Sequence, residues 1–272
     1  MKTSSVYKLI LTGFVLGIVL ACSATYTAQF PTPTSPALTQ TVTLPPAPTP
    51  ATPTVPNAGF TISTINFDEA GPDGEYIVTA QSPAILDSSD PVALAFNDRM
   101  QNLVQAEIAG FKQNVLDAPK DPSFAASSFD VKYNLLYQNG SLASIKFDFL
   151  GYISGAAHPY KYSATVNYDF SQGRSLALDE LFSPGSDYLE AIAGFCIAEL
   201  SKQPGFEGPW RDGAAPTSEN YQNWNVTADG LLITFDTYQV APGASGPQTV
   251  LVPYSELQAV IDPQGALADV TP

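Results

Sequence analysis

Three stretches in the middle of the chain alternate apolar and polar residues, and this period of two limits the possible folds more than any other feature. The stretches are 129–137, 145–149 and 162–170. Strict alternation is typical of strands with one face in a core and the other in water. Asn139-Gly140, between the first two stretches, favours a tight hairpin turn. The sequence therefore predicts an antiparallel sheet with one dry face.

Helices are expected between and beside these strands. Asp90-Pro91 is a good helix start, and apolar residues at helical spacing from Phe96 to Val115 indicate a long amphipathic helix that ends before Pro119. A second helix is expected over 186–202. Further strands are expected over 60–67, 75–80, 221–227, 231–237 and 248–253, and a short helix over 255–262. The predicted fold class is α+β, an antiparallel meander sheet with helices packed on one face.

The N-terminus has the pattern of a secretory signal. Lys2 and Lys8 precede the apolar run 9–20, and the small residue Ala21 precedes Cys22. A cysteine at this place resembles a bacterial lipobox, in which the thiol is acylated and becomes the mature N-terminus. We therefore expect residues 1–21 to be a lipoprotein signal peptide and Cys22 to be the lipidation site. A plain signal peptide or a single membrane anchor is the alternative.

The composition then divides the rest of the chain. Residues 22–58 are rich in proline and threonine, which predicts a disordered, extended tether. One α+β domain is expected over 59–265, with a smaller N-terminal segment at 59–126 and the main region at 127–265. Residues 266–272 are expected to be a disordered tail. An anchor, a spacer and a folded head predict a protein on the extracytoplasmic face of the bacterial cell membrane.

Charge and cysteine content narrow the partners. The net charge of -15 is spread along the chain, which argues against nucleic acid and against direct adhesion to anionic lipid, because both need clustered lysine and arginine. It allows a cationic partner. Cys196 falls on the apolar stripe of the helix expected at 186–202, so we expect a buried free thiol.

Catalytic motifs are sparse. The chain has one histidine, His158, which excludes a site built from several histidines. Ser154 lies four residues before it, and because a nucleophile and its base are recognised by geometry, this pair stays open. No metal and no cofactor are expected, and catalysis is not expected either.

Two loops stand out as candidate contact surfaces. Residues 154–159 place small residues and His158 between two good strands, and 238–247 form a long glycine-rich loop. Loops of that length in a compact domain are often functional. Trp210 and Trp224 are either flat contact surfaces or core residues.

The two loops and the strands between them carry a family resemblance. The segments are Gly155-Ala156-Ala157-His158, 164–169, 173–182, 229–231, Tyr238-Gln239-Val240-Ala241-Pro242, Gly246-Pro247 and 252–254. Over about 130–262 the chain resembles the extracellular domain of RsiV-type anti-sigma factors, which also occurs in PdaC-type peptidoglycan deacetylases. The chain departs from the family pattern at Pro159 and at 243–246, both within the contact loops.

The resemblance implies a non-catalytic envelope module, because the deacetylase members carry their catalysis in a separate domain and the RsiV-type domain binds lysozyme. We therefore expect a lipid-anchored binding module with lysozyme or peptidoglycan as its partner. The binding residues carried over are Gly155, His158, Tyr238, Pro242 and Gly246. The alternatives are an enzyme or accessory domain acting on cell-wall glycan, and a purely structural spacer.

Overall fold

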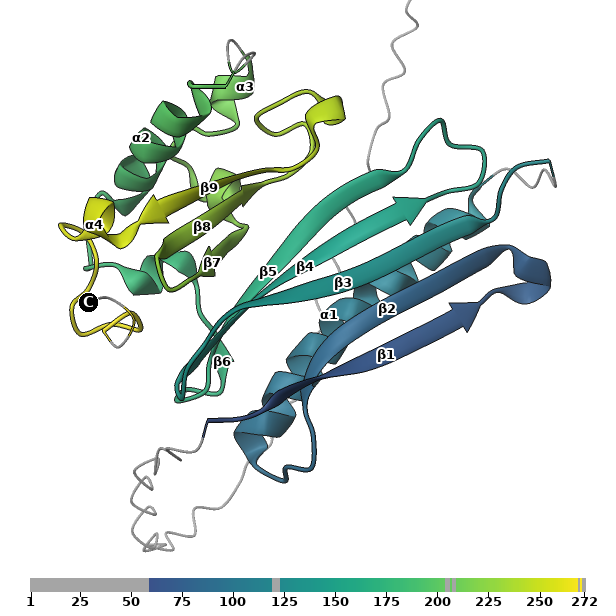
Figure 1. The fold of residues 1–272 in the computed structure, drawn as a ribbon, viewed down its shortest axis with the longest axis horizontal. Helices are drawn as coiled ribbons and strands as arrows, with labels where there is room; N and C mark the ends of the chain where they lie inside the picture. The colour runs from purple at the N-terminus through teal and green to yellow at the C-terminus, as the bar shows by residue number, and fades with distance from the viewer. Residues whose placement is uncertain (1–58, 119–122, 204–205, 207–208, 269, 271–272) are drawn as a thin grey trace, which may run out of the picture. The chain divides into compact units, whose positions relative to one another are not determined.

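The computed structural model describes residues 59–118, 123–203, 206, 209–268 and 270. The predicted signal peptide, Cys22 and the predicted tether lie outside the described residues. The strands form two sheets, one of six strands and one of three. Figure 1 shows α1 beside the larger sheet and the other labelled helices beside the smaller one. Within the described part of the chain, no helix is long and apolar enough to cross a membrane.

The larger sheet has the strand order β1-β2-β3-β4-β5-β6. Its strands are β1 (Ile62–Ala70), β2 (Tyr76–Ile85), β3 (Ser127–Gln138), β4 (Leu142–Tyr152), β5 (Tyr160–Asp169) and β6 (Arg174–Ser175). Neighbouring strands are antiparallel except β2 and β3, which are parallel. The parallel pair follows from α1 (Pro91–Leu116), because a crossover helix carries the chain back along the sheet before β3 begins. The N-terminal strands β1 and β2 thus belong to the same sheet as β3 to β6.

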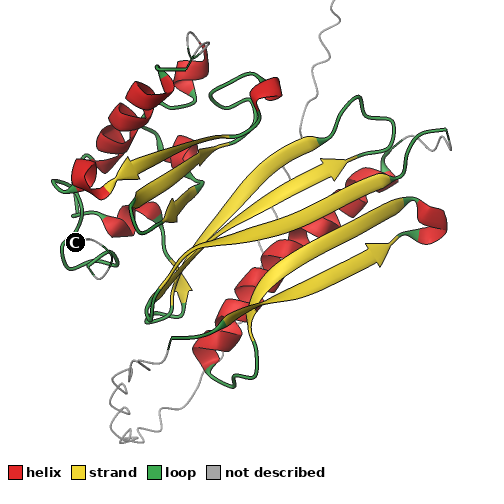
Figure 2. Cartoon of the chain, viewed as in Figure 1, coloured by secondary structure: helices red, strands yellow, loops and turns green. Residues whose placement is uncertain are grey.

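Helix α1 covers one face of this sheet (Figures 1 and 2). It begins at the Asp90 side chain, which accepts a hydrogen bond from the Val92 backbone N–H at 2.8 Å. One stripe of the helix is buried, namely Ala93, Phe96, Met100, Val104, Ile108, Phe111 and Val115. The rings of Phe111, Phe129 and Phe149 stack in series at centroid distances of 5.0 and 6.0 Å. The alternation read from the sequence therefore places its aromatic face against α1.

The smaller sheet consists of β7 (Trp224–Val226), β8 (Gly230–Phe235) and β9 (Gln248–Pro253), all antiparallel. The helices that accompany it are α2 (Tyr188–Leu200), α3 (Pro209–Asp212) and α4 (Tyr254–Leu257). Cys196 on α2 is fully buried in this second core, as predicted. Trp224 is buried and Trp210 is partly buried in the same core, so both tryptophans are packing residues.

Polar side chains join the two sheets. The Asn225 side-chain amide donates to Ser144 Oγ at 2.9 Å and to the Ile145 carbonyl at 3.0 Å. The Asn167 amide donates to the Trp224 carbonyl at 2.8 Å. All described residues accordingly belong to one compact unit.

The predicted α+β class is confirmed, with three differences. Residues 224–253 form a sheet of their own, because Leu231, Ile233 and Phe235 face α2 and not α1. The hairpin turn falls on Gly140-Ser141 and not on Asn139-Gly140, since the Asn139 N–H donates to the Leu142 carbonyl at 2.9 Å and Asn139 Oδ1 accepts from the backbone N–H groups of Ser141 and Leu142. Packing also continues beyond residue 265, where a tail was expected, because the Leu267 side chain is fully buried in the second core.

Candidate functional site

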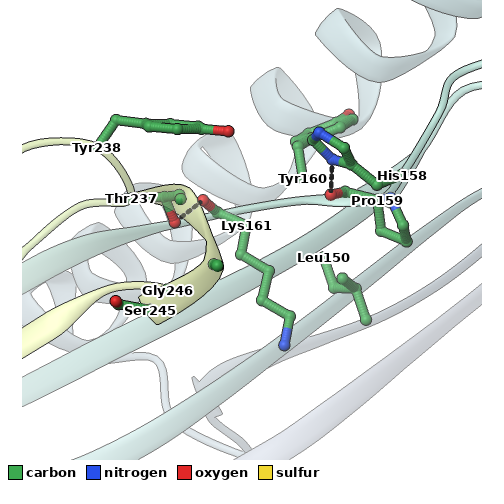
Figure 3. A pocket seen from close by; sticks show the side chains of 11 residues that line it. Leu150, His158, Pro159, Tyr160, Lys161, Thr237, Tyr238, Ser245 and Gly246 are labelled. Atoms are coloured by element: carbon green, nitrogen blue, oxygen red, sulfur yellow. Dashed lines mark hydrogen bonds between the residues drawn. The ribbon is translucent and has the colours of Figure 1, made fainter. Parts of the chain in front are cut away.

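The two loops singled out in the sequence meet at a pocket of about 970 Å³, within the size range of small-molecule sites. One wall comes from β4, the β4–β5 loop and the start of β5, and the other from the loop that joins β8 to β9. The residues lining it are Leu150, His158, Pro159, Tyr160, Lys161, Thr237, Tyr238, Gly243, Ala244, Ser245 and Gly246 (Figure 3). The pocket is the candidate functional site.

The β4–β5 loop is shaped by Gly155. Its φ of +82° lies in the left-handed region that favours glycine, and a Cβ there would lie 3.1 Å from the Phe124 ring. The Ala156 N–H donates to the Ile153 carbonyl at 2.9 Å, and the Ser154 N–H donates to Ser127 Oγ at 3.0 Å. Gly155 does not line the pocket, so its contribution is to set the backbone conformation of the loop that carries His158.

His158 contributes an exposed imidazole to the pocket wall. Its Nδ1 lies 2.9 Å from the Pro159 carbonyl oxygen. Because a carbonyl only accepts, Nδ1 carries the proton, and in the neutral ring Nε2 is an acceptor. No hydrogen bond joins His158 to Ser154 among the described residues, and Ser154 does not line the pocket. The structure therefore gives no support to Ser154 and His158 as a nucleophile–base pair.

Tyr160 is a lining residue that sequence reasoning missed, and its ring lies on the α1 side of the sheet, stacked against Tyr162 at a centroid distance of 6.1 Å. It pairs across the strands with Gly151, and its ring fills the space where a side chain at Gly151 would stand, since a Cβ there would lie only 2.2 Å from the Tyr160 Cζ atom. Burial raises the pKa of the Tyr160 phenol, so the hydroxyl stays protonated and can donate a hydrogen bond. An aromatic residue opposite a strand glycine was the signal that could have found it.

The β8–β9 loop is anchored by Gln239. Its side-chain amide donates to the carbonyls of Gly213 and Asn220, both at 2.9 Å, and its side-chain carbonyl accepts from the Asp236 N–H at 3.0 Å. Val240, the next residue, is fully buried. These contacts fix the start of the loop and so fix the position of Tyr238.

Tyr238 is the most exposed aromatic side chain of the pocket, at 61%. Its backbone adopts a φ of 71°, which is uncommon for a bulky residue. Its ring lies directly on Gly243, where a Cβ would lie 2.2 Å from the Tyr238 Cζ atom. Gly243 thus supports a flat ring whose outer face is open to a ligand.

The predicted binding residues fall into two groups. His158, Tyr238 and Gly246 line the pocket, whereas Gly155 and Pro242 lie in the backbone of its two loops. Pro242 precedes a 3₁₀ turn (Gly243–Ser245), and Gly246 ends that turn with a φ of 65°.

A half-buried carboxyl group lies beside the pocket. Asp236 accepts from the Ser163 N–H at 2.9 Å and from the Asn223 side-chain amide at 3.0 Å. Burial raises the pKa of this carboxyl, while those hydrogen bonds and the nearby Lys146 oppose the shift. The next residue, Thr237, donates to the Lys161 carbonyl at 3.1 Å and so joins the loop to β5.

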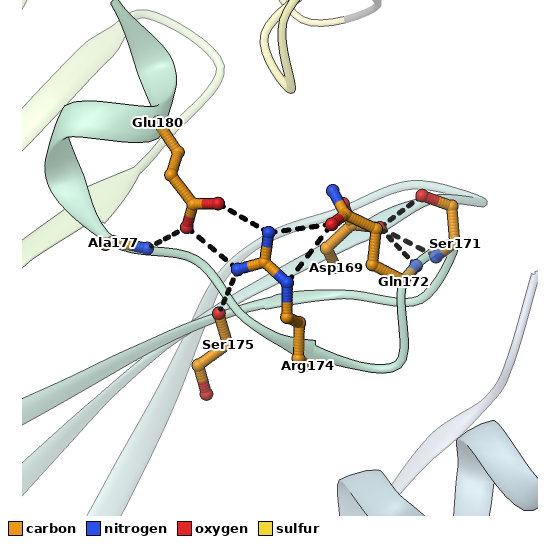
Figure 4. A network of polar contacts seen from close by, with 7 residues as sticks. All are labelled: Asp169, Ser171, Gln172, Arg174, Ser175, Ala177 and Glu180. Carbon is orange, nitrogen blue, oxygen red and sulfur yellow. Dashed lines mark hydrogen bonds and ion pairs between the residues drawn. The ribbon is translucent and has the colours of Figure 1, made fainter.

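The motif at 173–182 forms a separate polar network (Figure 4). Arg174 contacts both oxygens of Glu180, at 2.5 and 2.9 Å, and Glu180 also accepts from the Ala177 N–H at 2.7 Å. The hydrogen bonds from Arg174 and Ala177 lower the pKa of Glu180 to about 2. None of these residues lines the pocket, so this motif fixes the chain between the two sheets.

Within the part of the chain that the structure describes, no group of three or more His, Cys, Asp or Glu residues could hold a metal ion. The side chains that line the pocket offer an imidazole, an ammonium group, hydroxyls and an aromatic ring.

Comparison with known proteins relates this architecture to a family. Residues 179–255 match the family described as "Protein of unknown function (DUF3298)". This range includes the Tyr238 loop but not the His158 loop. The chain resembles two solved structures, a DUF3298 family member from Bacteroides fragilis (TM-score 0.58, 16% identity, 76% of this chain and 95% of that one) and one from Pseudomonas aeruginosa (0.55, 16%, 76% and 96%). At this identity the two structures establish the fold alone.

Relatives with assigned names are similar over part of their length. The chain is 27% identical over 168 residues to the peptidoglycan-N-acetylmuramic acid deacetylase PdaC of Bacillus subtilis, which is 61% of this chain and 36% of PdaC. It is 31% identical over 108 residues to the immunogenic protein MPT64 of Mycobacterium tuberculosis, 40% and 47% of the two chains. It is 29% identical over 103 residues to the Mycobacterium tuberculosis esterase Rv3036c, 38% and 45%. The chain thus spans less than half the length of each of these relatives.

These names support the resemblance to PdaC, and the RsiV-type resemblance stays a prediction. They also correct one expectation. The chain was predicted not to be an enzyme, but similar proteins are named a deacetylase and an esterase. Similarity to these proteins therefore points toward enzymatic activity, and the prediction of no catalysis is withdrawn.

Proposed function

We propose that this chain acts on the bacterial cell envelope and that its pocket holds a segment of peptidoglycan glycan. The observation that carries the proposal is Tyr238, an exposed ring supported from behind by Gly243 at the edge of a 970 Å³ pocket. Flat aromatic rings suit sugars, because they offer apolar area at a low cost in side-chain entropy. Similarity to a peptidoglycan deacetylase supports the choice of glycan.

The same pocket offers a group that could act on an acyl substituent. His158 Nε2 is a proton acceptor at the pocket wall, held in that tautomer by the Pro159 carbonyl. In the proposed reaction, water attacks the acyl carbonyl carbon of an ester and His158 takes a proton from that water. The bond between the acyl carbon and the sugar oxygen breaks, the proton passes to that oxygen, and the carboxylic acid leaves. The esterase and deacetylase names of two relatives support this chemistry.

Calorimetric titration with soluble peptidoglycan fragments tests the binding step. We expect saturable binding that weakens about fivefold in Tyr238→Ala, since the ring supplies the main apolar contact. Leu94→Ala is the matched control, because Leu94 is a large exposed residue on α1 that does not line the pocket. Equal affinities for the wild type and Tyr238→Ala would remove the pocket from the proposal.

Release of acetate from acetylated peptidoglycan tests the chemical step. We expect His158→Gln to abolish release while fragment binding is retained, and Ser154→Ala to leave release unchanged because Ser154 lies outside the pocket. Release that depends on Ser154 and not on His158 would contradict the assignment.

A second candidate function, binding of lysozyme, is favoured by the net charge of -15. Lysozyme is strongly basic, and opposite charge accelerates association and makes it sensitive to salt. Retention of lysozyme by the chain at low salt, lost at high salt and unaffected by Tyr238→Ala, would support this function over glycan binding in the pocket.

The proposal includes the location. Extracytoplasmic display through a lipid on Cys22 is tested by mass spectrometry of the N-terminal peptide of the cell-derived protein, where we expect an acylated cysteine at position 22.

A further inference from the structure

The charge of the pocket is opposite to that of the chain as a whole. The chain has 26 acidic and 11 basic residues, yet the lining contains no aspartate or glutamate and includes Lys161 and His158. The pocket lining is therefore basic although the chain as a whole is acidic.

The carboxylates nearest to the pocket along β4, β5 and the β8–β9 loop have partners of their own. Asp148 forms an ion pair with Lys146 and accepts from the Asn134 side-chain amide at 2.9 Å. Asp236 is bound by the Ser163 N–H and by Asn223. These carboxylates are therefore held away from Lys161 by interactions with other groups.

Glu107 of α1 is engaged in the same way. Its carboxylate accepts from the Tyr162 hydroxyl at 2.5 Å. Tyr162 follows Lys161 on β5 and points to the opposite face of the sheet, against the Phe149 ring at 4.7 Å. The Glu107 carboxylate therefore lies on the face of the sheet that α1 covers, opposite Lys161.

Lys161 is left available. Its side chain extends between the turn at 243–246 and Leu150, within the pocket (Figure 3). Among the described residues, no carboxylate lies within ion-pair distance of its ammonium group. Its backbone carbonyl is bound by Thr237, so the base of the side chain is fixed while the charged end is free to meet a ligand.

We infer that the pocket takes a saccharide that bears a carboxylate, with the Lys161 ammonium group bound to that carboxylate and the Tyr238 ring stacked on the sugar. The inference rests on the proposed function and narrows its ligand to acidic sugars. A charge-assisted hydrogen bond is stronger than a neutral one. Neutral sugars of the same size keep the stacking contact and lose the ionic one.

The test compares three probes on the full chain by NMR titration. N-acetylmuramic acid bears a carboxylate, its methyl ester has nearly the same shape without the charge, and N-acetylglucosamine lacks the whole lactyl group. We expect the acid to bind about fivefold more tightly than the ester, as one ion pair at an exposed ammonium group predicts. The preference should shrink as salt screens the ammonium group.

Two lysine variants separate this contact from the general charge of the protein. Lys161→Gln is expected to bind the acid and the ester equally while still binding both. Lys132→Gln is the control, because Lys132 is an exposed lysine on β3 that lies outside the pocket, 3.7 Å from Asp130. This variant should keep the full preference for the acid. Equal binding of acid and ester by the wild type, or a preference that survives Lys161→Gln, overturns the inference and leaves glycan binding standing. Failure of all three probes and of longer glycan fragments contradicts the proposed function itself.

Discussion

Gly243→Ala tests how the pocket presents its aromatic ring. An alanine Cβ at this position would lie 2.2 Å from Tyr238 Cζ and 2.4 Å from its hydroxyl oxygen. Nonbonded carbon atoms pack at about 3.5–4.0 Å, so the ring must withdraw by roughly 1.5 Å. Tyr238 is exposed and can swing outward, and a glycan held as proposed would then lose its flat contact.

The expected magnitudes follow from these contacts. Loss of an aromatic contact is worth about 1 kcal/mol, which is roughly a fivefold weaker affinity for peptidoglycan fragments. Because the ring is mostly exposed and Gly243 has no positive φ, the free energy of unfolding should change by less than about 0.5 kcal/mol. Calorimetric titration measures the first quantity and urea unfolding the second.

Two comparisons make the result interpretable. Gly140→Ala is the control, because a Cβ there meets nothing within 4 Å and the residue lies outside the pocket. In the double variant with Tyr238→Ala, the alanine at position 243 should cost nothing further, since the ring it displaces is gone. Additive losses in the double variant, or unchanged affinity in Gly243→Ala, would refute the idea that Gly243 supports the ring.

Three further predictions concern stability and reactivity. Glu180→Gln should lower the free energy of unfolding at neutral pH by no more than about 1 kcal/mol, because the Arg174 pair is partly exposed to screening solvent. The pKa of Glu180 in the folded protein is about 2, below its usual 4.5, so this stabilisation is present above pH 4.5 and is lost as the pH falls through 2. Urea unfolding at several pH values measures it, and a difference in stability between wild type and Glu180→Gln that persists below pH 2 would refute the prediction. Thr234→Val should stabilise the fold by about 1 kcal/mol, because the Thr234 hydroxyl is buried without a partner among the described residues, and a loss of stability would show that it has one. Burial raises the pKa of Cys196 to about 12, so peptide mapping should find this thiol unmodified by disulfide reagents at pH 8 until the protein is unfolded.

The sequence predicts the elements of the fold better than their arrangement. Alternation in β3 to β5 and the helical stripe from Phe96 to Val115 identify the first core, because each pattern depends only on neighbouring residues along one element. The separate second sheet depends on which core Leu231 and Ile233 enter, and that choice is made by tertiary packing against α2. Local periodicity cannot carry this information.

The candidate site shows the same division. His158 and Tyr238 could be found because a lone histidine and a long glycine-rich loop are visible in the sequence. Lys161 could not, since alternation assigns it only to one face of a strand, and Tyr160 could be found only through its pairing with Gly151. Their place in the pocket depends on the β8–β9 loop, which meets β5 through Thr237. Contacts between segments about 75 residues apart leave no local pattern.

Backbone amide shifts of the isotope-labelled full chain, recorded during titration with a soluble peptidoglycan fragment, test the proposed glycan site most directly. Glycan binding in the pocket predicts saturable shifts concentrated at residues 155–161 and 237–246, with the same midpoint at both loops. Shifts confined to other surfaces, or no shifts at fragment concentrations that saturate known glycan-binding proteins, would contradict it.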